Sequence, residues 1–368
     1  MTVDRITFVI PTLTSGGAER VLTTMADHWA GQGRAVTVLT LAAQNDSPFY
    51  PLAPGVQRVG LGQIRPASTP IHGAINNVVR LSRLRRAIRN SKPDVVISFL
   101  DQTNVLTLLA TRGLNLPVVV SEHTDPGLAQ RHRVWDRLRA LLYPRADRIV
   151  VLSESSKAFF PPGIRAKTRI IPNPVQVDCP AAPVQKSARP QVVAMGRFGP
   201  EKGFDRLIDA FSRIAADFPD WDLVIWGDGD LRPELTARRD RLGLTDRILL
   251  PGRTTSPHIE LRKASIYALT SHREGFPMAL AEAMACGVPA VAFDLPSGPR
   301  DIIRDGTDGE LVPNGDIPAF AEALASLMGD CTRRQRMADR APDVLDRFGV
   351  EPVMAIWDNV LGELTTTR

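Results

Sequence analysis

The first forty residues contain the pattern that most restricts the fold of this chain. Residues 5–11 form a short apolar run, residues 14–20 open an amphipathic helix, and residues 34–41 form a second apolar run. Apolar runs joined through a helix predict parallel strands buried between helices. Similar runs follow at residues 93–100, 117–124, 146–154, 170–175, 191–198, 222–226, 248–250 and 266–271. The sequence therefore predicts an α/β protein, which binds its ligands at the carboxyl ends of parallel strands.

Length and composition predict two domains. The chain has 368 residues, 43% of them hydrophobic, which is enough for two cores of ordinary size. Residues 178–190 are rich in proline and alanine and lack periodicity, so we interpret them as a linker between domains 1–177 and 191–350. Residues 351–368 are expected to form a helix that crosses back to the first domain. We expect neither a transmembrane helix nor a signal peptide, and three widely spaced cysteines indicate neither a disulfide framework nor a metal site.

Charge is divided unevenly between the two halves. Residues 1–180 hold 22 Lys and Arg against 12 Asp and Glu, whereas the remainder holds 23 against 28. The basic first half is expected to face an anionic partner.

Residues 271–289 (SHREGFPMALAEAMACGVP) predict a turn followed by a short helix. The helix is expected to begin near Pro277 or Met278 and to stop at Gly287. The unpaired N–H groups at such a helix start form an anion site, for which phosphate is a natural ligand.

Two carboxylates surround that helix start. Glu274 precedes it, and Glu282 lies about one turn further along the same element. Both can accept hydrogen bonds from hydroxyl groups, so a nucleoside diphosphate sugar would suit the arrangement. The spacing alone is equally consistent with a capped helix that carries two surface glutamates.

The two glutamates, with seven residues between them and followed by AMACGVP and VAFD, resemble the E-x7-E signature of the family 4 retaining glycosyltransferases. The resemblance implies the GT-B fold, in which two facing Rossmann-like domains with mostly parallel sheets enclose a cleft. It implies that Glu282 holds the ribose of the donor and Glu274 the hydroxyls of the transferred hexose. It also implies that backbone amides of the intervening segment, which includes Gly275, Phe276, Pro277 and Met278, hold the diphosphate of the donor.

A second donor-binding loop is expected after residues 191–198. Arg197 and Lys202 lie five residues apart on a strand-to-helix loop, where they could clamp a diphosphate, although a basic surface loop is the alternative. GRF followed by EKG resembles the second hallmark of the same family, and Arg253 and Thr254 fall where that family holds the nucleotide base. Asp228 and Asp230 are suitably spaced for a metal, but the resemblance makes them part of a donor-side turn, and we expect no metal or other cofactor.

Two features of the first half are candidates for the same site. Gly16 and Gly17 lack side chains and could approach a phosphate or sugar, or they could form a plain turn; the pattern is not G-x-G-x-x-G, so no nicotinamide site is indicated. His123 follows an apolar strand, where a packing role is the alternative. The resemblance implies that Gly16 and Gly17 help to bind the donor. It gives His123 a positioning or polarising role beside the transferred sugar.

Residues 71–92 predict a helix with a basic face. Leu81, Leu84 and Ile88 share one side. The arginines of the segment are Arg80, Arg83, Arg85, Arg86 and Arg89. Such a helix can lie against anionic headgroups or bind the phosphates of a lipid-linked acceptor. It can equally pack on a sheet with its basic face in water, and residues 131–143 repeat this ambiguity.

Within that family, the chain resembles bacterial glycosyltransferases that extend polyprenyl-diphosphate-linked or surface-polysaccharide glycans. The resemblance implies a retaining enzyme that moves a hexose or N-acetylhexosamine from a UDP-sugar to a glycan acceptor linked to polyprenyl diphosphate. We expect it to act at the cytoplasmic membrane face, as a peripheral protein on an anionic surface. A soluble or lipopolysaccharide-core acceptor is the nearest alternative, and a UDP-sugar epimerase would lack the E-x7-E pattern. A non-catalytic basic protein bound to membrane or nucleic acid is a further alternative, but the acidic second half argues against nucleic acid.

Overall fold

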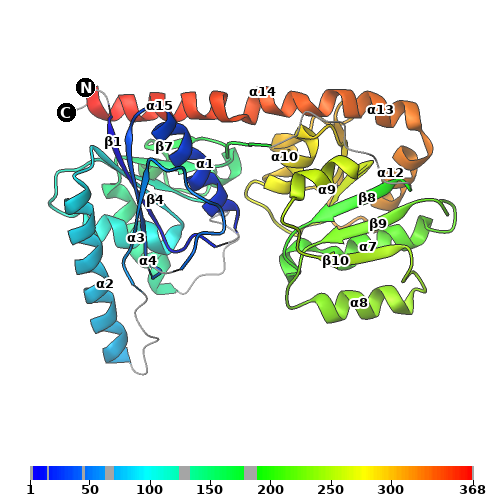
Figure 1. The fold of residues 1–368 in the computed structure, drawn as a ribbon, viewed down its shortest axis with the longest axis horizontal. Helices are drawn as coiled ribbons and strands as arrows, with labels where there is room; N and C mark the ends of the chain where they lie inside the picture. The colour runs from blue at the N-terminus through cyan, green and yellow to red at the C-terminus, as the bar shows by residue number, and fades with distance from the viewer. Residues whose placement is uncertain are drawn as a thin grey trace. The chain divides into compact units, whose positions relative to one another are not determined.

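The computed structural model describes residues 3–14, 16–43, 46–62, 70–123, 133–177 and 189–366. The chain divides into two compact units (Figure 1). Unit 1 comprises Met1–Pro174 and Val350–Arg368, and unit 2 comprises Val175–Gly349. Most of the predicted linker, residues 178–188, lies outside the described residues.

Unit 1 is built on a seven-stranded, all-parallel sheet in the order β3-β2-β1-β4-β5-β6-β7. The neighbours Phe8 and Val9 point to opposite faces of the sheet, yet both are fully buried, so helices cover both faces. The strands are β1 Arg5–Ile10, β2 Ala35–Thr40, β3 Val56–Gly60, β4 Val95–Phe99, β5 Val118–Ser121, β6 Arg148–Val151 and β7 Thr168–Ile170. The helices are α1 Gly17–Gly31, α2 Pro70–Ser91, α3 Asp101–Ala110, α4 Arg133–Leu142, η1 Tyr143–Arg145, α5 Glu154–Ala158, α6 Pro162–Arg165 and α15 Val350–Thr366.

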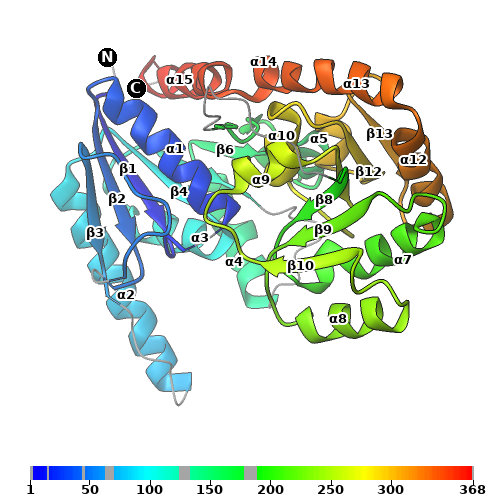
Figure 2. The same cartoon turned by 45° about the vertical axis from the view of Figure 1, so that its right-hand side comes forward.

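The C-terminal helix α15 packs on α1. The Trp29 and Trp357 rings meet edge to face with centroids 6.3 Å apart. The Asp358 carboxylate accepts a hydrogen bond from Trp29 Nε1 at 3.0 Å and pairs with Arg34 at 2.8 Å. The end of the chain is therefore part of the core of unit 1, as the red helix beside the blue α1 shows in Figure 2.

Replacing Asp358 with alanine is expected to lower the free energy of unfolding by about 1–3 kcal/mol, because the buried indole N–H of Trp29 loses its acceptor. Glu363→Ala is the matched control on the same helix, since Glu363 pairs with Arg148 and Arg169 at the surface. Its loss should cost about 1 kcal/mol or less. Urea unfolding followed by tryptophan fluorescence measures both, and equal losses would contradict the role given to Asp358.

Unit 2 repeats the architecture with a six-stranded, all-parallel sheet in the order β10-β9-β8-β11-β12-β13. The strands are β8 Gln191–Met195, β9 Asp222–Trp226, β10 Ile248–Gly252, β11 Ile266–Leu269, β12 Ala290–Asp294 and β13 Gly309–Pro313. The helices are η2 Pro200–Lys202, α7 Phe204–Ile214, α8 Arg232–Arg241, α9 Pro257–Lys263, α10 Met278–Ala285, α11 Pro299–Ile302, α12 Ile317–Gly329, α13 Cys331–Arg340, η3 Ala341–Asp343 and α14 Val344–Phe348.

Each sheet reverses its strand order once. In unit 1 the reversal lies between β1 and β4, and in unit 2 it lies between β8 and β11. The loops that follow these two strands diverge on opposite faces of the sheet, which leaves room for a ligand between them. The expected α/β fold with two Rossmann-like units is confirmed, and the strand order identifies the two places where a site can form.

Two local predictions differ from the structure. The predicted strand at 170–175 is displaced to Thr168–Ile170, because Pro172 and Pro174 have no N–H with which to continue the ladder. The edge strand β3 was not predicted, since its sequence VQRVG is neither a continuous apolar run nor strictly alternating. None of the helices among the described residues is long and apolar enough to cross a bilayer.

Candidate functional site

The strand reversal in unit 2 brings together two loops that are far apart in the sequence. Gly203 ends the loop after β8, and Thr270 begins the loop after β11. The Thr270 hydroxyl donates a hydrogen bond to the Gly203 carbonyl at 2.8 Å. Gly203 has φ +60°, and a Cβ at this residue would lie 2.3 Å from the Thr270 carbonyl oxygen, so only glycine fits. The two predicted donor-binding loops therefore touch.

Lys202 and Glu274 form the centre of the contact between these loops. Lys202 Nζ lies 2.6 Å from Glu274 Oε1, although 72 residues separate the two in sequence. The Ser271 hydroxyl donates to the same oxygen at 2.7 Å. The Glu274 side chain is only 10% exposed and that of Lys202 24%. The carboxylate is thus fixed by donors from both loops and still reaches the surface.

A third loop, after β12, supports the backbone at Glu274. The Ser297 hydroxyl donates to the Glu274 carbonyl at 2.6 Å. Gly298 has φ +87°, and a Cβ there would lie 2.8 Å from Pro277 Cδ. Asp301 accepts a hydrogen bond from the Gly298 N–H at 2.9 Å, so its role in this chain is to cap α11.

Helix α10 begins at Met278 and ends at Ala285, as the sequence predicted. No side chain caps its first turn. Its N-terminal N–H groups and helix dipole therefore suit an anion. Glu282, in the second turn, is 2% exposed. The Phe276 side chain packs edge to face on Phe348 at 5.3 Å, so it serves the core and leaves only its backbone for a ligand.

Tyr267 is a buried group that lies within reach of the negative charge of both glutamates. Its ring is fully buried on β11, and its hydroxyl faces the Met195 carbonyl at 3.4 Å. Burial, together with the negative charges of Glu274 and Glu282, raises the pKa of Tyr267 well above its ordinary value. Tyr267 therefore stays neutral, and both carboxylates act on the same buried hydroxyl.

The remaining predicted donor residues are more peripheral. The Arg197 side chain is 73% exposed and pairs with Glu201 at 2.9 Å. Arg253 is exposed and Thr254 half-buried at the end of β10, where Thr254 accepts a hydrogen bond from the Ser256 N–H at 3.0 Å. Asp228 pairs with Arg232 at 2.8 Å. Within the described ranges, no group of three metal-ligating side chains is close enough to hold an ion.

The corresponding edge of unit 1 carries the predicted glycines. Helix α1 begins at Gly17, and Gly16 is its N-cap in extended backbone. A Cβ at Gly16 would lie 2.1 Å from Glu19 Oε2, so glycine leaves room for that carboxylate. Thr12 donates to Glu19 Oε1 at 3.4 Å, while burial raises the pKa of Glu19. The polar group at this turn is therefore Glu19, which was not predicted from the sequence.

His123 lies two residues beyond β5 in a well-defined environment. Its ring stacks on Phe99 with centroids 4.5 Å apart, and its Nε2 is 3.0 Å from the Ser121 hydroxyl. Burial lowers the pKa of His123 to about 3, and a hydrogen bond with Asn173 opposes that shift. The imidazole is neutral at pH 7, which fits a positioning or polarising role better than that of a charged group.

A buried hydrogen-bond network lies next to the residues that precede His123. The Tyr143 hydroxyl donates to the buried carboxylate of Glu122. Asn104 donates to both the Ser121 carbonyl and the Tyr143 hydroxyl, and it accepts from Ser98 at 2.7 Å. Because buried polar groups are costly unless they are paired, the network fixes the two residues that precede His123.

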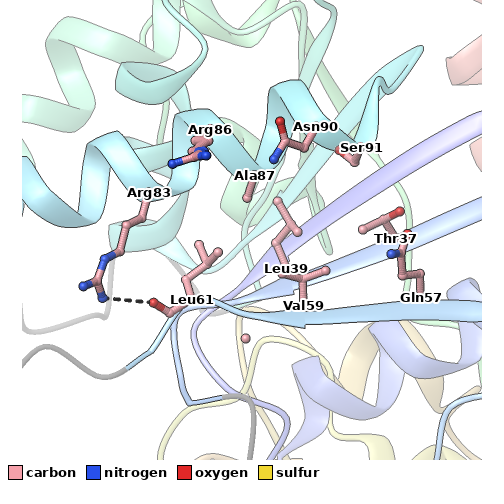
Figure 3. A pocket seen from close by; sticks show the side chains of 11 residues that line it. Thr37, Leu39, Gln57, Val59, Leu61, Arg83, Arg86, Ala87, Asn90 and Ser91 are labelled. Carbon is pink, nitrogen blue, oxygen red and sulfur yellow. Dashed lines mark hydrogen bonds between the residues drawn. The ribbon is translucent and has the colours of Figure 1, made fainter.

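The predicted basic helix α2 borders a groove along β2 and β3 (Figure 3). The groove measures about 430 Å³ and has an apolar floor that includes Leu39, Val59 and Leu61. Arg83 and Arg86 line it from α2, and Arg83 donates to the Leu61 carbonyl at 3.2 Å. The remaining lining residues are Thr37, Gln57, Gly60, Ala87, Asn90 and Ser91.

The five predicted arginines of α2 do not form one surface. Leu84 and Ile88 are buried as expected. Arg85 donates to the Ala110 and Arg112 carbonyls at 2.7 and 2.8 Å. Arg85 thus satisfies carbonyls at the end of α3. Arg83, Arg86 and Arg89 are exposed, whereas Arg80 and Arg85 are half-buried.

Comparison with known proteins agrees with this architecture. Residues 15–178 match the model "Glycosyltransferase Family 4" and residues 180–344 match "Glycosyl transferases group 1". Among solved structures, Anabaena HepE in complex with UDP is similar over 99% of this chain and 100% of that chain, with a TM-score of 0.77 and 20% identity. The two family models identify a glycosyltransferase, and the two parallel-sheet units give it the GT-B fold. The chain belongs to the glycosyltransferase family that these two models describe, and it is an enzyme of EC class 2.4.

Two curated relatives come from Campylobacter jejuni. A GalNAc-alpha-(1->4)-GalNAc-alpha-(1->3)-diNAcBac-PP-undecaprenol alpha-1,4-N-acetyl-D-galactosaminyltransferase is 29% identical over 98% of this chain and 99% of its own length. An N-acetylgalactosamine-N,N'-diacetylbacillosaminyl-diphospho-undecaprenol 4-alpha-N-acetylgalactosaminyltransferase is 26% identical over 92% of this chain and 94% of its own length.

Proposed function

We propose that this glycosyltransferase moves a hexose or N-acetylhexosamine from a UDP-sugar to a glycan linked to polyprenyl diphosphate, with retention of anomeric configuration. The observation that carries the proposal is the Lys202–Glu274 ion pair at 2.6 Å, placed just before the uncapped N-terminus of α10. A cation, a fixed carboxylate and free helix amides match the phosphates and hydroxyls of a nucleotide sugar.

Unit 2 is proposed to hold the donor. Lys202 and the first turn of α10 would bind the diphosphate, and Glu274 would accept hydrogen bonds from the sugar hydroxyls. Glu282 would hold the ribose, and Arg253 and Thr254 would lie near the base. The structural relative HepE is described in complex with UDP, which supports a uridine nucleotide.

We propose the following transfer step for this site. The acceptor hydroxyl oxygen forms a bond to C1 of the donor sugar on the face from which UDP leaves. The bond between C1 and the diphosphate oxygen breaks, and UDP departs with the electron pair. The leaving phosphate oxygen takes the hydroxyl proton, while Lys202 and the helix amides stabilise the growing negative charge. The neutral His123 would position the sugar.

A lipid-linked acceptor is supported by two observations. Both Campylobacter relatives are named for undecaprenyl-diphosphate-linked glycans. Unit 1 carries Arg86 and Arg89 exposed on α2, and Arg86 lines the groove of Figure 3. These side chains suit anionic headgroups or phosphates at the cytoplasmic membrane face.

The test is incubation with radiolabelled UDP-sugars and polyprenyl-diphosphate-linked glycan. Label from one donor should move into the organic phase, and NMR of the product should show the anomeric configuration of the donor. An inverted product would contradict the retaining mechanism. Label that enters only a water-soluble product would assign the enzyme a soluble acceptor instead.

Reversing two charges on α2 is expected to weaken membrane association. The variant Arg86→Glu/Arg89→Glu should bind vesicles of 30% anionic phospholipid at least tenfold more weakly in low salt, since each basic residue near such a surface contributes about 1 kcal/mol. The control Arg213→Glu/Arg241→Glu makes the same charge change in unit 2. Sedimentation of vesicles measures both, and equal weakening, or no binding by the wild type, would refute a docking role for α2.

A further inference from the structure

The short helix α9 presents a buried histidine to the second glutamate of the donor site. His258 Nε2 lies 3.8 Å from Glu282 Oε2, within ion-pair distance. His258 is 7% exposed and Glu282 2%. Figures 1 and 2 both show α9 directly beside α10, the helix that carries Glu282. Neither the sequence pattern nor the resemblance assigned His258 any role.

The position of His258 in the chain links two parts of the proposed donor site. Helix α9 begins at Pro257, three residues after Thr254, at the end of the segment expected to hold the base. The Ser256 N–H donates to Thr254 Oγ1, which fixes the turn between the two. A single short connection therefore joins the base segment to a side chain that touches the proposed ribose carboxylate.

His258 is part of the surroundings of a carboxylate that is almost fully buried. A carboxylate that is almost fully buried is costly unless hydrogen-bond donors or positive charge face it. At 3.8 Å the His258 imidazole packs against the Glu282 carboxylate, and because both side chains are buried, this contact limits the orientations that the carboxylate can adopt.

We propose that His258 is a positioning residue that orients Glu282 toward the ribose hydroxyls of the donor nucleotide. This inference rests on the proposed function, because it takes Glu282 as the ribose-binding carboxylate. Its consequence is specific: the preference of the enzyme for a ribonucleotide over a dideoxyribonucleotide depends on His258, whereas binding of the base and phosphates does not.

The experiment compares the affinities of the full-length protein for UDP and for 2′,3′-dideoxy-UDP by calorimetry. Hydrogen bonds from two hydroxyls to a carboxylate should make wild-type binding of UDP about 10- to 100-fold tighter than that of the dideoxy compound. His258→Ala should reduce this ratio at least fivefold and leave the affinity for dideoxy-UDP within twofold. His258→Gln, which retains an N–H donor, should recover most of the ratio, and it also serves if the alanine variant does not fold.

The possible results distinguish a failure of the role of His258 from a failure of the ribose-binding role of Glu282. An unchanged ratio in His258→Ala, or equal losses for both nucleotides, overturns the positioning role, because a merely structural defect would weaken both alike. Glu282→Ala is the reference and should bring the ratio close to one. If the wild-type ratio is itself close to one and Glu282→Ala leaves it unchanged, the ribose assignment of Glu282 fails, and the role of His258 fails with it.

Discussion

Replacing Glu274 with alanine is expected to lower the kcat/KM for sugar transfer by about two to four orders of magnitude, because each hydrogen bond from a sugar hydroxyl to a charged carboxylate is worth about 1.5–3 kcal/mol. The affinity for UDP should stay within a few-fold, since UDP lacks the transferred sugar. Ser271 and Lys202 fix Glu274 Oε1 in the free enzyme, so the carboxylate is already oriented before the donor binds.

The control for this variant is Glu322→Ala, which removes an exposed glutamate from α12 in the same unit. It should retain wild-type activity and UDP affinity. UDP release gives the rate, and calorimetry gives the affinity. Persistent transfer by Glu274→Ala would show that another group holds the sugar, whereas a parallel collapse of UDP binding would indicate that the loop itself had lost its structure.

Replacing Lys202 with alanine is expected to weaken UDP binding by about 10- to 100-fold at low salt, because a charge-assisted contact to phosphate is lost. Lys202→Arg should retain more of the affinity, since it keeps the charge with a different geometry. Arg197→Ala should cost less, because Arg197 is 73% exposed and pairs with Glu201 at the surface.

The control is Arg213→Ala, which removes an exposed cation of α7 and so measures the general effect of losing a positive charge from unit 2. Calorimetric titration with UDP at two salt concentrations compares the four variants. If Lys202→Ala binds UDP like the wild type, the loop after β8 is an ordinary basic surface and the proposed diphosphate contact is wrong.

Much of the fold could be predicted because apolar periodicity is a local signal. The strand Asp222–Trp226 has the bounds that were predicted, and α10 begins at Met278 as its turn residues indicated. In contrast, β3 is a half-buried edge strand whose sequence contains Gln57 and Arg58, so it carries no apolar pattern. Its place in the sheet follows from pairing with β2, which is a tertiary contact.

The candidate site was predictable in its residues but not in its contacts. The pairing of Lys202 with Glu274 depends on the strand order, which places β8 beside β11 although 70 residues separate them. The sequence did not indicate that the hydroxyls of Ser271 and Ser297 would donate hydrogen bonds to Glu274, although both serines lie in the predicted loops. The contact of His258 with Glu282 could not be predicted either, because a single histidine in an amphipathic helix is more often a packing residue.

The arginines of α2 show that a helical pattern does not predict which charged side chains remain at the surface. Five arginines predicted one basic face, yet the long side chain of Arg85 reaches two carbonyls at the end of α3. The carbonyls that it satisfies lie 25 and 27 residues away, so the sequence of the helix could not reveal them.

The most direct test of the proposed function is UDP release from a panel of UDP-sugars, with and without a bacterial extract of lipid-linked oligosaccharides, in the wild type and in Glu274→Ala. We expect release from one donor, strong stimulation by the extract, and no stimulated release by the variant. UDP binding without stimulation by the extract would contradict the lipid-linked acceptor, and release by Glu274→Ala at the wild-type rate would contradict the site itself.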